Sequence, residues 1–189
     1  DNLKVSEYME FFAACYHLEG FAARKRASSL LEQVGLGERK DAFVDGLSRG
    51  MQQRLCLARA LIHDPEFLIM DEPTAGLDPK GRDEILDEIS ALHRDRHMTI
   101  ILVSHSMEDI ARYADRIMVM NHGEKVFDAP PKEVFRHYKE LEAIGLAAPQ
   151  ITYIVQGLKE HGMPIADDIT TVAEAKDAIL QLLGKDERP

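Results

Sequence analysis

The sequence predicts an α/β fold in which a parallel sheet with helical crossovers is preceded and followed by helical segments. Short apolar runs at 67–70 (FLIM) and 99–105 (TIILVSH) alternate with stretches of helical spacing, which is typical of βαβ units. By contrast, residues 5–34 and the chain beyond Pro131 show helical spacing without apolar runs of this kind. The parallel sheet is therefore expected in the middle of the chain.

Two helices are predicted before the first strand. The first covers 5–17, and its apolar side chains are Val5, Met9, Phe12 and Tyr16. The second runs from about 21 to 34 and stops at Gly35, with these residues facing inward: Ala27, Leu30, Leu31 and Val34. A loop over 35–46 then leads to the central segment.

The central elements follow in strand and helix order. Ser48 can cap a helix that ends at His63-Asp64-Pro65 and has an apolar face of Met51, Leu55, Ala58, Leu61 and Ile62. The run 67–70 lacks alternation, so we expect a strand buried on both faces. A helix over about 81–96 has Ile85, Ile89 and Leu92 facing inward, and it leads to a second buried strand.

Capping and turn patterns predict the remaining elements. Ser106 and Asp109 have the spacing of a capping box, and 116–120 with 125–127 reads as a hairpin. Three further helices are predicted, at 132–144 closed by Gly145, at 150–160, and at 172–183 capped by Thr171 with Glu174.

Composition limits the possible partners. The 189 residues have a net charge of −10, which argues against a nucleic-acid backbone as the main partner, although a bound nucleotide needs only a local nest of donors. No apolar run is long enough to span a bilayer. Cys15 and Cys56 match no disulfide or zinc spacing, so we expect them to be small buried residues.

Reactive side chains follow both predicted strands, where ligands bind in open α/β sheets. Asp71-Glu72 ends one strand and Ser104-His105 ends the other. Asp71 could hold Mg²⁺ on a phosphate, Glu72 could orient or deprotonate an attacking water, and His105 could hydrogen-bond the terminal phosphate. Taken singly, a strand that ends in Asp-Glu is common and a lone histidine there is more often structural.

The segment LSRGMQQR (47–54) places Ser48 and Gly50 at a helix start, where free N–H groups and the helix dipole favour an anion. Gly50 would let the backbone approach such a ligand closely. An ordinary capped surface helix is the alternative reading of this segment taken alone.

Together these motifs resemble the ATP-binding subunits of ABC transporters. LSRGMQQR is similar to the signature LSGGQxxR, IMDEP (69–73) to the Walker B strand, AGLD (75–78) to the D-loop and Ser104-His105 to the switch histidine. Arg49 and Met51 depart from the signature, which has Gly and Gln there, whereas Ser48 and Gly50 are intact. The resemblance covers roughly residues 1–128.

The resemblance implies part of a P-loop NTPase sheet and two cofactors, ATP and Mg²⁺. It assigns Asp71 to the metal, Glu72 and His105 to catalysis, Asp78 to communication across a dimer, and Ser48 with Gly50 to a partner's ATP. The implied partners are a second ATP-binding subunit, identical or different, and transmembrane transporter subunits, with no nucleic acid. The implied location is the cytoplasmic face of a membrane.

The phosphate-binding motif GxxxxGK[ST] does not occur in the 189 residues, and the sequence does not begin with Met. We therefore expect a fragment, with a partial ATPase domain over 1–130 and a helical extension over 131–189. Within the first part, a helical subdomain is expected over about 1–63 and the catalytic core over about 64–130. A parallel sheet without its neighbouring strands should expose edges and apolar faces.

Several functional alternatives stay open at this stage. The chain before about 80 is similar to exporter-type ATPases, whereas 104–165 is similar to energy-coupling-factor ATPases, which we favour; a chimera would also give this mixture. A non-catalytic interaction or dimerisation module derived from such an ATPase is another class of function. A non-transport ABC ATPase is the third.

We expect the 189-residue chain by itself to bind Mg-ATP no tighter than about 1 mM, or roughly −4 kcal/mol. The loop amides and lysine that usually complement the β- and γ-phosphates are absent from its sequence, and its net charge of −10 repels the anion. Calorimetric titration measures this affinity. A micromolar dissociation constant would mean that other groups hold the nucleotide.

Overall fold

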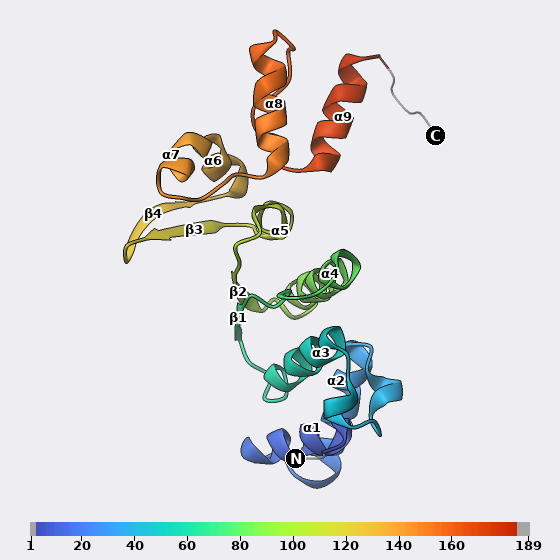
Figure 1. Cartoon of the computed structure of the whole chain (residues 1–189). Helices are drawn as coiled ribbons and strands as arrows, with labels where there is room; N and C mark the ends of the chain where they lie inside the picture. Colours follow the sequence, from blue (N-terminus) through green and yellow to red (C-terminus); the bar gives the residue numbers. More distant parts are fainter. Residues whose placement is uncertain (1–2, 185–189) are drawn as a thin grey trace. The chain divides into compact units, whose positions relative to one another are not determined.

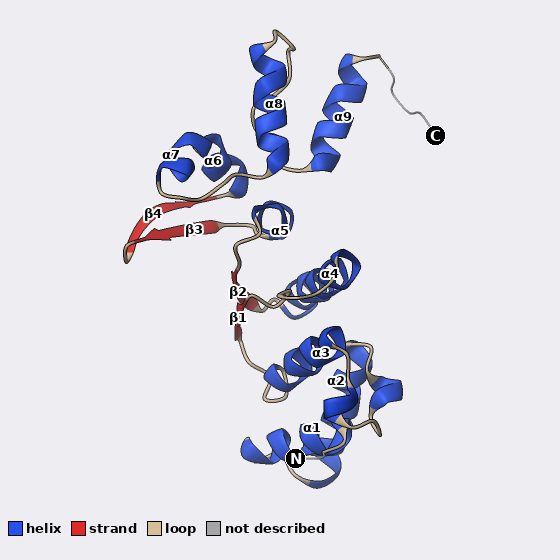
Figure 2. Ribbon diagram, viewed as in Figure 1, coloured by secondary structure: helices blue, strands red, loops and turns tan. Residues whose placement is uncertain are grey.

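The computed structural model describes residues 3–184, which form two compact units, one up to Val103 and one from Ser104 onward. Residues 1–2 and 185–189, at the outer ends of the two predicted domains, lie outside the described residues. Helices predominate in both units, and each unit has a two-stranded sheet (Figures 1 and 2). The α/β class expected from the sequence is thus confirmed.

The first unit begins with a helical group. Helix α1 (Val5–Cys15) and helix α2 (Gly20–Gln33) pack against each other and against α3 (Arg49–Ala60). The connection from α2 to α3 contains two short 3-10 turns, η1 (Gly37–Arg39) and η2 (Val44–Gly46). The predicted inward residues of α2 and most of those of α3 are buried, and the shared core includes Val5, Met9, Leu30, Leu31, Val34, Leu55, Leu61 and Ile62.

Two predicted helix ends are confirmed by local geometry. Gly35 follows α2 with a φ of +69°, the left-handed conformation that glycine adopts at little cost. At the end of α3, Arg26 donates hydrogen bonds to the carbonyl oxygens of Leu61 (3.0 Å) and Ile62 (3.3 Å), and to the Asp64 carboxylate (2.7 Å). Arg26 thereby satisfies carbonyls that have no partner within the helix.

The strands of the first unit are β1 (Phe67–Asp71) and β2 (Thr99–Val103), which pair in parallel. Helix α4 (Pro79–Arg96) connects them, as expected for a βαβ unit. Its apolar side consists of Ile85, Leu86, Ile89 and Leu92, all buried. The register sets Phe67 opposite Thr99 and Asp71 opposite Val103, so both strands end at the same edge of the sheet.

The prediction that these strands are buried on both faces is wrong. Leu68 is only 5% exposed, but Phe67 is 63% and Ile69 is 68% exposed, and Ile101 and Val103 on β2 are about half exposed. Because alternate residues point to opposite faces, these four side chains share the face that nothing in the first unit's described residues covers. The expected exposure of an apolar sheet face is therefore confirmed.

Cys15 and Cys56 are both exposed, contrary to expectation. Each lies on the helix side that faces away from its buried neighbours, which are Ala13 in α1 and Leu55, Leu57 and Ala58 in α3.

No helix in the described part of the chain is both long and apolar enough to cross a bilayer.

The second unit starts with α5 (Met107–Tyr113), whose predicted cap is observed: the Ser106 hydroxyl accepts a hydrogen bond from the Asp109 backbone N–H (3.4 Å). The predicted hairpin is formed by β3 (Ile117–Asn121) and β4 (Glu124–Ala129), which pair antiparallel. His122 and Gly123 between them have φ values of 50° and 85°. Two consecutive positive φ values are typical of the type I′ turns that close tight hairpins.

The helix predicted over 132–144 is two helices, α6 (Pro131–Arg136) and α7 (Tyr138–Ala143), separated at His137. In one continuous helix, Phe135 and Leu141 would point about 120° apart. With the break, both are buried in one core with Ile117, Val119, Val134 and Ala148. Gly145 (φ +82°) follows α7, so the predicted stop is confirmed.

The last two helices, α8 (Gln150–Glu160) and α9 (Val172–Leu182), agree with the prediction. They share a small core of Val155, Ile165, Ile169 and Ala175. Thr171 caps α9 as expected: its hydroxyl accepts from the Glu174 N–H (3.3 Å), and the Glu174 carboxylate accepts in return from the Thr171 N–H (3.2 Å).

Glu174 also predicts a pH dependence for the second unit. Burial opposes ionisation, but the ion pair with Lys132 (2.8 Å) and the N–H groups of Thr170 and Thr171 outweigh it and lower the pKa of Glu174 to about 2. Because the pKa of Glu174 is lower in the folded state than in the unfolded state, its ionisation stabilises the fold at pH values above 4.5. This stabilisation disappears as the pH falls from 4.5 toward 2.

Glu174→Gln is therefore expected to lower the free energy of unfolding at pH 6 by about 1 kcal/mol, a value reduced for solvent screening of a partly exposed group. The difference from the unsubstituted chain should shrink as the pH falls below 4.5 and approach zero only near pH 2. Thermal unfolding monitored by circular dichroism between pH 2 and 6 measures it, with Glu133→Gln on exposed α6 surface as the control. A difference that does not change with pH would contradict the ionic contribution.

Candidate functional site

The start of α3 has the geometry that its motif predicts. Ser48 is exposed and caps the helix, its hydroxyl accepting a hydrogen bond from the Met51 N–H (3.4 Å). Gly50 lies in the first turn, and a Cβ added there would meet only the Leu77 side chain, at 3.8 Å. The first amides of the helix therefore lie beside the loop that leads from β1 to α4.

The end of β1 presents the two adjacent carboxylates. Asp71 is the last residue of the strand and is exposed. Glu72 has a left-handed φ of +47°, its N–H donates to the Val103 carbonyl (2.9 Å), and its own carbonyl accepts from the Ala75 N–H (3.0 Å). Left-handed non-glycine residues cost roughly 1 kcal/mol or more and concentrate at functional sites, where the surrounding structure holds them.

Asp78 has a local role in addition to the one that its motif implies. It caps α4, its carboxylate accepting from the Gly81 N–H (3.2 Å), and Pro79 follows at the first helical position. The nearby Gly76 has a φ of +72°, and a Cβ there would displace the Arg49 guanidinium. Arg49, the unusual residue of the signature-like segment, therefore packs against the backbone of Gly76.

A cavity of about 270 Å³ lies between α3, β1 and α4 and is bordered by Gln53, Leu57, Leu68, Asp71 and Ile85 among others. Its lining is mainly apolar, and Asp71 is one of the residues that border it. The predicted metal residue thus borders a space that the described part of the first unit leaves open.

His105 belongs to the second unit, where it lies exposed between β2 and α5. The neighbouring Ser104 hydroxyl accepts a hydrogen bond from the Ser106 N–H (3.2 Å). The first unit thus contains Ser48, Gly50, Asp71, Glu72 and Asp78, and the roles of all six residues stay predictions.

The available donors fit a phosphate-bound Mg²⁺ better than a metal held by protein alone. Among residues 3–184, no group of three or more His, Cys, Asp or Glu side chains is arranged to hold a metal. Mg²⁺ is usually bound through one or two carboxylates together with substrate phosphates. Asp71 can supply such a carboxylate, and the amides at the start of α3 suit an anion.

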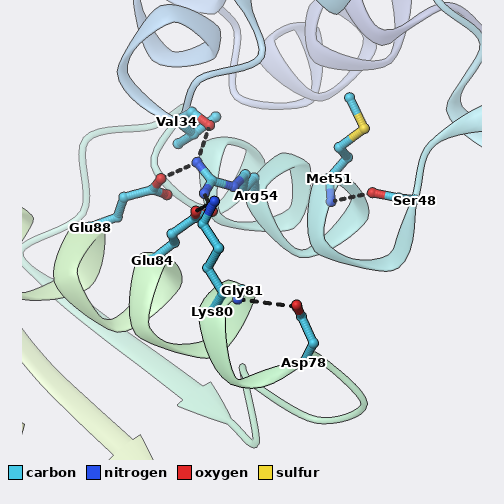
Figure 3. A network of polar contacts seen from close by, with 9 residues as sticks. All are labelled: Val34, Ser48, Met51, Arg54, Asp78, Lys80, Gly81, Glu84 and Glu88. Carbon is cyan, nitrogen blue, oxygen red and sulfur yellow. Dashed lines mark hydrogen bonds and ion pairs between the residues drawn. The ribbon is translucent and has the colours of Figure 1, made fainter.

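Sequence reasoning assigned no role to Arg54, the last residue of the signature-like segment. Arg54 donates to the Val34 carbonyl (3.1 Å), to the Glu84 carboxylate (2.7 Å) and to the Glu88 carboxylate, and it joins α3 to the end of α2 and to α4 (Figure 3). Glu84 and Glu88 are like charges four residues apart, which is destabilising without a cation between them. The like-charged pair of Glu84 and Glu88 was therefore the feature of the sequence that could have indicated a cation at this position.

Burial raises the pKa of Glu88, and Arg54 only partly offsets this effect, while the nearby Glu84 adds to it. The Glu88 side chain is 24% exposed and that of Arg54 is 19% exposed. Arg54 is therefore the charge that makes an ionised Glu88 tolerable at this helix contact.

The chain is similar in sequence to known proteins over most of its length. Residues 2–75 match the family model described as ABC transporter. The energy-coupling factor transporter ATP-binding protein EcfA2 of Clostridium perfringens (strain 13 / Type A) is 48% identical over 161 residues, 84% of this chain and 56% of that protein. EcfA2 of Clostridium tetani (strain Massachusetts / E88) is 49% identical over 162 residues, 85% of this chain and 56% of that protein.

A solved structure is similar in fold as well. The structure titled cbiO1 from Clostridium perfringens, part of the ABC transporter complex cbiONQ, has a TM-score of 0.68 and 31% identity, and the match covers 82% of this chain and 62% of that one. The chain spans about 56% of the length of the curated relatives it matches. Residues 2–75 thus match an ABC transporter domain, and most of the chain is similar in sequence to the ATP-binding proteins of energy-coupling factor transporters.

Proposed function

We propose that the complete protein is the ATP-binding and ATP-hydrolysing subunit of an ABC transporter of the energy-coupling factor type, which powers solute transport through membrane subunits. The observation that carries this is the exposed Asp71 followed by a left-handed Glu72 at the end of β1, in a chain nearly half identical to such ATP-binding proteins. A carboxylate on a strained backbone beside an exposed carboxylate suits metal-assisted hydrolysis of a phosphoanhydride better than a passive docking role.

Each candidate residue has a distinct chemical role in this proposal. Asp71 holds Mg²⁺ together with phosphate oxygens, and bound Mg²⁺ neutralises charge on the phosphates. Glu72 accepts a hydrogen bond from the attacking water and orients it or takes its proton. His105 donates a hydrogen bond to the terminal phosphate, where negative charge has to be stabilised.

Ser48 and Gly50 serve a nucleotide held by a second ATP-binding subunit. The hydroxyl of Ser48 and the amides of the first turn of α3 lie together at an exposed helix start. A helix N-terminus of this kind favours the binding of phosphate. Asp78 begins α4 beside this position and connects the two sites across the dimer. The partner subunit is identical or different, and transmembrane subunits complete the transporter on the cytoplasmic face of the membrane.

Hydrolysis of Mg-ATP by the complete protein tests the assignment. Activity that is lost on Glu72→Gln supports an ATPase, whereas a complete protein that binds Mg-ATP but never turns it over would instead be a non-catalytic interaction module.

A further inference from the structure

We propose that Arg54 is a positioning residue, which with Glu84 and Glu88 sets the start of α3 in register with the start of α4. The inference rests on the proposed function, because it concerns how Ser48, Gly50 and Asp78 are presented to the partner's nucleotide. Arg54 itself contacts neither Asp71 nor Glu72 among the hydrogen bonds and ion pairs of the described residues.

The first step is the geometry of the network. The Arg54 guanidinium spreads over three acceptors on two other helices: the Val34 carbonyl at the end of α2, and the Glu84 and Glu88 carboxylates one turn apart on α4. Three acceptors at fixed positions define both the height and the rotation of α3 against α4. A single ion pair would leave the two helices free to slide along each other.

The second step is the spacing to the candidate residues. Ser48 lies six residues before Arg54, and Asp78 lies six residues before Glu84. At 1.5 Å per residue, each helix start is about 9 Å from the network. In Figure 3, Ser48 and Asp78 lie on the same side of the Arg54 cluster, so the network joins the two helices near the ends that carry these residues.

The third step is a contact between the two helix starts themselves. Arg49 packs against Gly76, and a Cβ added at Gly50 would lie 3.8 Å from the Leu77 side chain. The first contact is to loop backbone and the second is to the Leu77 side chain, and neither is an ion pair. The Arg54 network, with side chains 19–46% exposed, adds charged hydrogen bonds between α3 and α4 themselves.

The choice of arginine follows from this arrangement. A planar guanidinium offers five donors in a fixed fork and can serve a carbonyl and two carboxylates together, whereas a lysine ammonium acts as a point charge on a flexible stem. Arg54→Lys therefore keeps the charge that Glu88 needs but loses the fixed register. This substitution separates positioning from simple charge balance.

The test measures steady-state ATP hydrolysis by the complete protein. Arg54→Lys is expected to lower kcat at least tenfold and to change KM less than twofold, because misplacing Ser48 and Gly50 impairs closure on the partner's nucleotide but not binding at the chain's own carboxylates. The double variant Glu84→Gln/Glu88→Gln should show a similar loss. Adding Arg54→Lys to it should lower kcat less than twofold further, since the three residues act as one unit.

Two controls accompany these variants. Arg24→Lys makes the same change in an exposed pair with Glu10, and Lys80→Gln removes an exposed pair with Glu84 that lies within α4 alone; both should leave kcat within twofold. Activities are divided by the folded fraction, measured by circular dichroism at the assay temperature. A loss that vanishes on this correction shows a merely structural role and overturns the proposal.

The proposal is also overturned if Arg54→Lys leaves kcat within twofold of the unsubstituted protein, or if the losses in the combined variant simply multiply. Failure of the proposed function gives a different result, since either the unsubstituted protein would not hydrolyse ATP or Glu72→Gln would retain hydrolysis. An inactive Glu72→Gln with a fully active Arg54→Lys removes only the positioning role.

Discussion

Glu72→Gln in the complete protein is expected to reduce ATP hydrolysis at least 100-fold and to leave ATP binding within about threefold. A positioned general base contributes roughly 10²–10⁴-fold, and an amide can neither take the proton nor hold the water in the same way. Gln has nearly the shape of Glu and faces the same backbone cost at the left-handed φ of +47°, so the fold should not change. Phosphate release measures hydrolysis, and calorimetry measures binding.

A matched control comes from the other end of the same strand. Glu66 is exposed and directly precedes β1, so Glu66→Gln makes the same change in charge without touching the carboxyl end of the sheet. It should retain full activity. If Glu72→Gln hydrolyses ATP within threefold of the unsubstituted protein, Glu72 is not the residue that handles the attacking water.

Gly50→Asp is expected to have the second largest effect, a loss of hydrolysis of about 100-fold together with loss of ATP-dependent dimerisation. A carboxylate about 5 Å from a partner's phosphate is repelled by about 3 kcal/mol at an effective dielectric constant near 20. The monomer should fold normally, because the added Cβ meets only Leu77 at 3.8 Å and an acidic residue in the first turn favours the helix.

Light scattering with Mg-ATP, in the hydrolysis-deficient Glu72→Gln background, measures the dimer. Gly157→Asp is the control, since it adds the same charge in α8 at a position where a Cβ meets nothing within 4 Å. A Gly50→Asp protein that still dimerises with ATP would show that the start of α3 does not face a nucleotide. A protein that is monomeric with ATP even without Gly50→Asp would contradict the shared site altogether.

Much of the secondary structure follows from interactions within a few residues. The caps at Ser48, Ser106 and Thr171 are pairings between a hydroxyl and an amide three positions later, and the turn at His122-Gly123 needs only a residue pair that tolerates positive φ. The candidate catalytic residues could also be predicted from the sequence, because the pairs Asp71-Glu72 and Ser104-His105 follow apolar runs. Their roles stay predictions until the substitutions are made.

Features that depend on elements distant in the chain could not be predicted from the sequence in this way. The run FLIM contains no sign of which side a neighbour will cover, so the exposure of Phe67 and Ile69 is decided by the packing of the sheet. The break at His137 likewise arises because Phe135 and Leu141 reach one core that also draws on β3. The burial of a side chain is a property of the assembled elements and not of its own segment.

The sequence by itself determined the order of strands and helices, the helix ends and the residues that carry the expected chemistry, since each depends on local spacing and residue type. Only the tertiary structure decided that Arg54 meets Val34, Glu84 and Glu88, residues up to 34 positions away in the chain. It did so because hydrogen-bond geometry between helices depends on how their apolar faces pack, and that packing is set by the whole core at once.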